Sequence, residues 1–162
     1  MKIILLFLGV SILIFGCAKQ SNNAYQKQLI DKYVKYWNTG NFEGIDEVLH
    51  QDFELFATPT YDAESGIEKF MEVITKSRTA YPDFHIRLDE EIYGDNEGAV
   101  RWTITATHTG QGNMAPTEKR VEVKGISLFH IVDNKIKDEW VAGNDLHWLQ
   151  QLGFTLTPPS AD

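Results

Sequence analysis

Residues 120–154, RVEVKGISLFHIVDNKIKDEWVAGNDLHWLQQLGF, decide the predicted fold. Two segments of alternating apolar and polar residues meet at Asp133-Asn134, a dipeptide typical of a tight β-hairpin turn. The second of these strands ends at Trp140. A short helix over residues 146–152 follows, and Gly153 is a suitable residue for the position after its last turn. The domain is therefore expected to end in a hairpin and a terminal helix.

Three further helices are predicted before the strands, over residues 24–38, 42–49 and 66–80. Leu29, Tyr33 and Trp37 recur at helical spacing in the first of them. Ser65 and Glu68 have the spacing of a capping box, in which each side chain bonds to the backbone of the other, at the start of the third.

Apolar residues alternate with polar ones from Phe84 onward, as at Ile86 and Leu88, which predicts strands in place of helices. Helices followed by long antiparallel strands indicate an α+β domain. We expect a curved antiparallel β-sheet with the N-terminal helices packed on its concave face, so that sheet and helices form a cone around a pocket.

The N-terminal segment has the pattern of a secretory signal. Residues 1–16 contain one charge, Lys2, and an apolar run that is too short for a comfortable membrane span. The run ends in Gly16-Cys17, which resembles a bacterial lipobox. The sequence thus divides into a signal peptide (1–16), a polar tether (17–23), one domain (24–154) and a loose tail (155–162).

Cys17 is the single cysteine of the chain, so no intramolecular disulfide can form. Acyl chains such as palmitate on Cys17 would anchor the protein to a membrane of the cell envelope without a spanning helix. Ala18 after the cysteine favours the outer membrane if the source is Gram-negative, and a Gram-positive source stays open. The alternative is an uncleaved anchor with an incidental cysteine.

The chain is acidic, with a net charge of −8 that becomes −9 once residues 1–16 and their Lys2 are removed. This balance argues against nucleic acid as a partner, because nucleic-acid binding requires basic patches. No phosphate-cradling glycine loop or nucleophilic serine motif is present. The histidines do not have metal-ligand spacing. Neither a metal nor a cofactor is expected.

Three sequence blocks carry a resemblance to a known family: Ala106-Thr-His-Thr-Gly110 with Ala115-Pro-Thr117, then residues 119–126, then Trp140 with Gln150-Gln-Leu-Gly153. Together they resemble the SnoaL-like polyketide cyclases, also called ester cyclases, of the nuclear-transport-factor-two-like superfamily. The resemblance covers residues 24–154. It implies a cone-shaped fold and a cofactor-free intramolecular aldol condensation, with an Asp after the last strand as acid/base and a His from the preceding strand assisting.

The family position of the acid is occupied by Asn144, counted both from Trp140 and from Gly153, and Asp145 follows it. A neutral amide cannot act as a base, although it can orient a carbonyl group. The resemblance therefore makes Asp145 and His130 the candidate catalytic residues. The alternatives are that Asn144 or Asp145 caps the terminal helix and that His130 faces solvent.

Six residues are candidates for binding a ligand in the pocket: Asn144, His108, Trp140, Trp102, Trp37 and Tyr33. Three functions stay open. The first is a cofactor-independent cyclase or isomerase acting on a small apolar carbonyl or ester compound. The second is a lipid-anchored protein that binds such a ligand without chemistry. The third is an interaction module that pairs as a homodimer through the open sheet face, as the resemblance implies.

Overall fold

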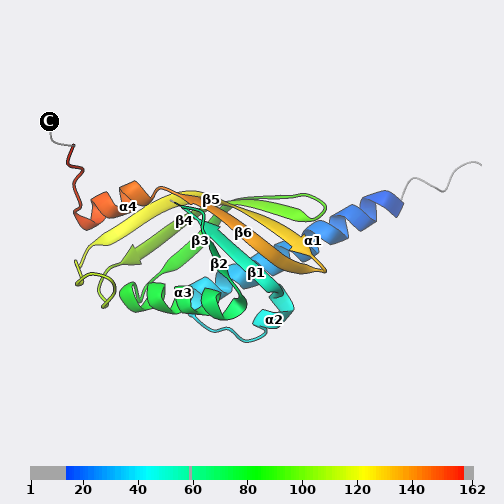
Figure 1. Cartoon of the computed structure of the whole chain (residues 1–162). Coiled ribbons are helices and arrows are strands. Elements are labelled where there is room, and N and C mark those ends of the chain that lie inside the picture. The colour runs from blue at the N-terminus through cyan, green and yellow to red at the C-terminus, as the bar shows by residue number, and fades with distance from the viewer. Residues whose placement is uncertain (1–13, 59, 159–162) are drawn as a thin grey trace, which may run out of the picture.

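The computed structural model describes residues 14–58 and 60–158, with side chains from Asn23 onward. Along these residues the elements are α1 (Ile14–Thr39), α2 (Ile45–Val48), β1 (Leu49–Ala57), β2 (Ala63–Ser65), α3 (Ile67–Ala80), β3 (His85–Tyr93), β4 (Glu97–Thr107), β5 (Arg120–Val132), β6 (Lys135–Gly143) and α4 (Asp145–Leu152). The strands form one curved, unclosed sheet in the order β2-β1-β6-β5-β4-β3. Figure 1 shows α1 and α3 on one face of this sheet and α4 at its end. The predicted α+β fold is confirmed.

One pairing in the sheet differs from the antiparallel arrangement that we expected. β1 runs parallel to β6, whereas the other neighbours are antiparallel. Parallel neighbours need a long crossover connection. Residues 58–134, with α3 and four strands, supply that connection, and no local sequence pattern predicts such a long-range pairing.

The hairpin between β5 and β6 is confirmed. Asp133 and Asn134 have φ angles of 50° and 60°, and two consecutive positive φ values are those of the tight turn that matches the twist of the strands. Helix α4 ends as predicted at Gly153, which has a φ angle of 106°. These two local features determine where β6 begins and where α4 ends.

Helix α1 begins at Ile14, ten residues before the predicted start at Ala24. The backbone of residues 17–23, predicted as a polar tether, is therefore helical. No Gly or Pro interrupts the chain between Cys17 and Thr39, so nothing local stops the helix before Gly40. Residues 1–13 of the predicted signal peptide, and the side chain of Cys17, lie outside the part of the chain that the structure describes.

The predicted capping box at the start of α3 is wrong. The residue before α3 is Gly66, which makes no side-chain cap. Ser65 belongs to the short strand β2, which pairs with β1, and the Ser65 hydroxyl group lies 3.5 Å from the carboxylate of Glu54. Strand pairing holds Ser65 away from the helix, so its hydroxyl group does not reach the Glu68 amide.

A bulge in β6 changes which side chains face the helices. His130 pairs with Asp138, but its neighbour Ile131 pairs with Ile136, so Lys137 is an extra residue in β6. A one-residue bulge inverts the alternation of the strand beyond it. As a result both Ile136 and Glu139 are buried on the helix-covered face, although they are three residues apart.

Candidate functional site

A cavity of about 240 Å³ lies between the concave face of the sheet and the helices α1 and α3. Its walls are largely apolar and aromatic, and include Val34, Leu55, Val73, Ile86, Leu88 and Phe129. The residues at the α4 end of the cavity include Thr58 and Asp145, and the Asp145 side chain is exposed. This end is therefore the mouth. An apolar cavity with a few polar groups is the usual form of a small-molecule site.

The floor of the cavity holds a carboxyl group that sequence reasoning missed. Glu139 extends from β6 and is 5% exposed. The Tyr33 hydroxyl group donates a hydrogen bond to Oε2 of Glu139, and the Ser127 side chain also bonds to this carboxyl group. Trp102 Nε1 donates to Ser127 Oγ at 2.9 Å. A connected polar network thus lies within an otherwise apolar interior.

Burial determines how Glu139 and Tyr33 titrate. Loss of solvation raises the pKa of Glu139 to about 7, although the hydrogen bonds from Ser127 and Tyr33 act in the opposite direction. The pKa of Tyr33 is raised well above its ordinary value by burial and by the negative charge of Glu139. Glu139 is therefore a carboxyl group that can exchange a proton near neutral pH, whereas Tyr33 keeps its proton.

Strict alternation along the last strand hides Glu139. Counted from the apolar residue Ile136, alternation would place Asp138 and Trp140 inward and Glu139 outward. The bulge at Lys137 reverses this order. A signal does exist in the sequence, because Lys137-Asp138-Glu139 breaks the apolar alternation of the strand, but it does not tell which of the three residues faces inward.

Asp145, the predicted base, lines the mouth of the cavity. It is the first residue of α4, and its Oδ2 accepts a hydrogen bond from the hydroxyl group of Thr58, which follows β1. The connection between β6 and α4 thus places one carboxylate at the mouth, while β6 itself places Glu139 at the floor. The role of Asp145 as a base stays a prediction.

Asn144 does not face the cavity. Its Oδ1 accepts a hydrogen bond from the backbone N–H of His147 at 3.0 Å, and its side chain is exposed. Asn144 is therefore the N-cap of α4, as the alternative hypothesis for this residue predicts. Capping occupies the amide oxygen that would otherwise orient a ligand carbonyl group, so the expectation that Asn144 binds a ligand in the cavity is not met.

The two candidate histidines also lie outside the cavity. His130 lies between the inward residues Phe129 and Ile131, so alternation directs it to the opposite face of the sheet. There its Nδ1 lies 2.6 Å from Oδ1 of Asp138. The expectation that His130 assists Asp145 is therefore not met, because the sheet separates the two side chains.

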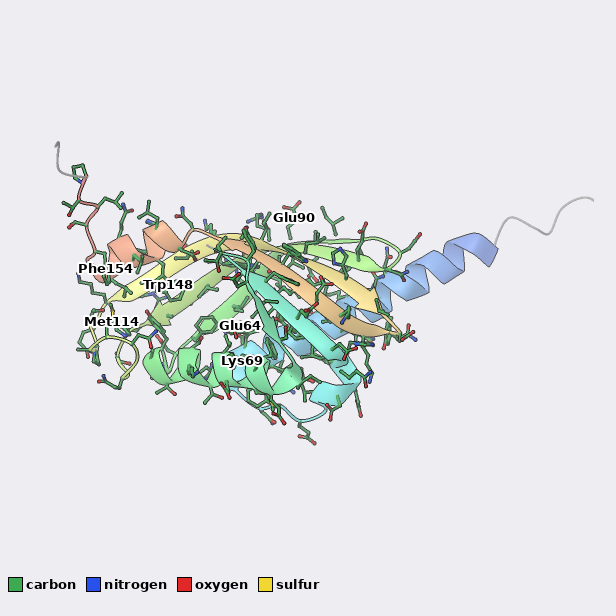
Figure 2. The ribbon with its side chains drawn as sticks, in the orientation of Figure 1. Glu64, Lys69, Glu90, Met114, Trp148 and Phe154 are labelled. Carbon is green, nitrogen blue, oxygen red and sulfur yellow. The ribbon has the colours of Figure 1, made fainter. Side chains whose placement is uncertain are left out.

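His108 is buried beside a different hollow, formed by α3, α4 and the loop between β4 and β5. Its ring packs against Tyr81, with centroids 4.9 Å apart, and its Nδ1 accepts a hydrogen bond from the Thr117 N–H at 3.2 Å. Figure 2 shows Met114 and Trp148, which also line this hollow, at the α4 end of the molecule. His108 follows the end of β4 at Thr107 and so lies beyond Trp102 and Ile104, the β4 residues nearest to it that line the cavity.

Three of the four aromatic candidates line the cavity: Tyr33, Trp37 and Trp102. The Trp102 ring lies over Gly125, where a Cβ atom would be 2.3 Å from the ring, so only glycine leaves room for it. Trp140 is different, because the bulge turns it to the outer face of the sheet. It is 41% exposed there and stacks on Phe56, with ring centroids 4.2 Å apart.

The described residues contain neither a metal-binding cluster nor a helix that could span a membrane. No group of three or more His, Cys, Asp or Glu side chains in that part of the chain is placed to hold a metal ion. Between residues 14 and 158, Pro59 excepted, no helix combines the length and the apolar character needed to cross a membrane.

Comparison with curated proteins gives two relatives from Streptomyces. The nogalonic acid methyl ester cyclase of Streptomyces nogalater is 28% identical over 123 residues, which are 74% of this chain and 91% of the relative. The aklanonic acid methyl ester cyclase of Streptomyces peucetius is 28% identical over 132 residues, which are 79% of this chain and 90% of the relative.

Solved structures share the fold at lower identity. A structure described as a SnoaL-like polyketide cyclase from Jannaschia sp. CCS1 has a TM-score of 0.74 at 14% identity, covering 85% of this chain and 96% of the other. TsrD from Streptomyces laurentii has a TM-score of 0.71 at 24% identity, covering 80% and 96%. The family model of the SnoaL-like polyketide cyclases matches residues 27–152, from α1 to the end of α4. The chain therefore belongs to the SnoaL-like polyketide cyclase family.

Proposed function

We propose that this protein is a cofactor-independent acid–base enzyme of the cyclase or isomerase type, acting on a small, largely apolar carbonyl or ester compound. One observation carries the proposal: the carboxylate of Asp145 lines the mouth of an apolar cavity. The two curated relatives, both named as methyl ester cyclases, support the reaction class.

In the proposed reaction, Asp145 takes a proton from the carbon next to a carbonyl group of the substrate. The electron pair of the broken C–H bond forms an enolate, whose carbon attacks a second carbonyl group and closes a ring. The oxygen of the second carbonyl group then takes up a proton, so that atoms and charge balance. Thr58 donates a hydrogen bond to Asp145 and holds the carboxylate at the mouth.

The test uses two neutral probes that match the size of the cavity. The first is benzylacetone, whose exchange of α-protons for deuterium in heavy water is followed by NMR. The second is acetonylacetone, a linear diketone whose aldol closure, followed by loss of water, gives a conjugated enone that absorbs ultraviolet light. We expect the full-length protein to accelerate both, and Asp145→Asn to slow both by about a hundredfold.

Glu122→Gln is the matched control, because Glu122 is an exposed carboxylate on β5 that does not line the cavity. It should leave both rates unchanged. Rates equal to those of buffer in the wild-type protein would overturn the proposal, and a fully active Asp145→Asn variant would overturn the assignment of the base.

The alternative is a protein that binds a small ligand in the same cavity without chemistry. Asn144, at the position where the family resemblance implies an acid, favours it. Saturable calorimetric binding of benzylacetone, with no α-proton exchange, would support this function over catalysis.

A third function is an interaction module that pairs two copies through the outer face of the sheet. Large apolar side chains are exposed on this face, including Ile92 at 64% and Ile126 at 57%. They line a hollow of about 560 Å³ together with Trp140.

We also propose that the protein is exported and anchored to a membrane of the cell envelope by lipid on Cys17. The apolar run of residues 1–16 followed by Gly16-Cys17 supports this location. Labelling with palmitate in a bacterial host tests it, since Cys17→Ser should abolish both the label and the membrane association. An exported cyclase would meet substrates other than those of cytoplasmic polyketide synthesis.

A further inference from the structure

We propose that Glu139 is the proton donor of this site, acting from the floor of the cavity on the substrate oxygen while Asp145 acts from the mouth. This inference rests on the proposed function and adds to it the second half of the acid–base pair. It follows from where the two carboxyl groups lie and from the hydrogen bonds that converge on Glu139.

The proposed reaction requires such a donor. When Asp145 has taken the α-proton and the new carbon–carbon bond has formed, a negative charge develops on the oxygen of the attacked carbonyl group. A proton delivered to that oxygen completes the ring closure. His130 and Asn144, the residues expected to assist Asp145, lie on the outer face of the sheet and at the cap of α4.

The hydroxyl groups of the side chains that line the cavity cannot supply this proton at neutral pH. The Thr58 hydroxyl group donates to Asp145, and the Tyr33 hydroxyl group donates to Glu139. Burial holds the pKa of Tyr33 far above neutral, and serine and threonine hydroxyl groups are weaker acids still. Glu139, whose pKa lies at about 7, is the group in the cavity whose proton is both held and releasable.

The hydrogen bonds around Glu139 stabilise its deprotonated form, the carboxylate. Trp102 Nε1 donates to Ser127 Oγ, which leaves the Ser127 proton free to point toward Glu139. The Tyr33 hydroxyl group donates to Oε2 of Glu139. Both donors stabilise the carboxylate that Glu139 becomes. Asp145 then releases its proton to water at the mouth, and Glu139 takes one back from water, so protons balance over a turnover.

The same arrangement restricts the substrate. None of the described residues that line the cavity is Lys or Arg, and two of them are carboxylic acids. A negatively charged substrate would therefore be repelled at the mouth and left without a partner inside. We infer that the substrate is uncharged and has no free acid group next to its reacting carbonyl groups.

The first experiment needs no substrate. Infrared difference spectra of the full-length protein, recorded across the pH range, report the carbonyl stretch of protonated carboxyl groups. We expect one such band to disappear near pH 7 in the wild-type protein and in Asp145→Asn, and to be absent from Glu139→Gln. A wild-type protein without a carboxyl group titrating near pH 7 would overturn the inference.

The second experiment measures ring closure of acetonylacetone against pH. The wild-type rate should fall above about pH 7 as Glu139 ionises. Glu139→Gln, which keeps the shape of the side chain, should be about a hundredfold slower and show no fall. Tyr33→Phe should move the midpoint of the fall to higher pH, because the carboxylate loses a donor, and a merely structural role would not move this midpoint.

The outcomes separate the two proposals. Wild-type protein that does not close the ring at all overturns the proposed function. Ring closure that depends on Asp145 but is unchanged in rate and pH profile by Glu139→Gln overturns the role of Glu139 alone.

Discussion

Glu139 carries a carboxyl group into the concave face of the sheet because β6 contains one extra residue. The bulge at Lys137 turns Glu139 inward and Trp140 outward, which exchanges the positions that alternation predicts. Burying a carboxyl group is costly unless hydrogen bonds accompany it, and Tyr33 and Ser127 provide them. The bulge thus places the buried carboxyl group of Glu139 where a ligand would lie.

The raised pKa of Glu139 predicts how the stability of the protein depends on pH. Below about pH 4.5 the folded and the unfolded protein both hold this proton, so no penalty arises. As the pH rises to about 7 the unfolded chain releases the proton while the folded protein keeps it. The free energy of unfolding should therefore fall over this range by roughly 3 kcal/mol from this group, and the fall should end above the folded pKa.

Urea denaturation of the wild-type protein and of Glu139→Gln, at about pH 4.5 and about pH 8, measures this effect. As the pH rises, the free energy of unfolding of the variant should increase relative to that of the wild-type protein. Other carboxylates, such as Asp83 and Asp89 with their lowered pKa values, are common to both proteins and cancel in the difference. A difference between the two proteins that does not change with pH would contradict the raised pKa.

At the scale of elements, the start of α4 gives the adjacent residues Asn144 and Asp145 different roles. Asn144 turns its side chain back onto the N–H of His147, while Asp145 in the first turn faces Thr58 at the end of β1. A carboxylate is favoured near the N-terminus of a helix by the helix dipole. The start of this eight-residue helix therefore positions the proposed base.

Substitution of the cap should affect stability and not the chemistry of the site. We expect Asn144→Ala to lower the free energy of unfolding by about 1 kcal/mol, because one N–H group at the start of α4 loses its acceptor. Asn144→Asp should cost little, since Asp caps helices as well as Asn does. Thermal and urea denaturation of both variants measure these changes.

The same variants test the placement of residue 144. Asn144→Asp restores the acid type expected at this family position, but its side chain should remain at the cap. Its rate of benzylacetone exchange should therefore equal that of the wild-type protein. A marked increase in rate would show that residue 144 reaches the substrate.

At the scale of the whole molecule, the two faces of the sheet differ in what covers them. Helices α1 and α3 lie on the concave face, and the outer face exposes Ile126, Leu128 and Trp140. Glu90 and Arg101 line the hollow on this outer face together with the apolar residues, and Figure 2 shows Glu90 there, away from α3. Exposed apolar surface of this kind is typical of a protein interface.

If this face pairs two copies of the chain, sedimentation at micromolar concentration should give a dimer. Ile126→Glu should then shift the protein to monomer, because a charge would be buried in the centre of the interface. Glu122→Gln, on the same strand but at an exposed polar position, is the control. A wild-type protein that is monomeric at these concentrations would argue against the interaction module.

Local sequence patterns determined the elements of the fold with few exceptions. The Asp133-Asn134 turn, the end of α4 at Gly153 and the inward face of Phe84, Ile86 and Leu88 follow from backbone preferences and from alternation. The Ser65 capping box failed, because Ser65 pairs with β1 as part of the strand β2. Backbone propensity decides where an element begins only when tertiary pairing does not compete for the same residues.

The sequence by itself determined the family, the cavity-lining positions of Tyr33, Trp37 and Trp102, and Asp145 as a carboxylate near the last strand. Only the tertiary structure decided that His130 and Trp140 lie on the outer face, that His108 lies beside another hollow, and that Glu139 lies at the cavity floor. The physical reason is that a strand residue can face either side of the sheet. The bulge in β6 depends on how β6 pairs with its two neighbouring strands, and it reverses which residues face the cavity. The sequence of one strand does not show such a bulge.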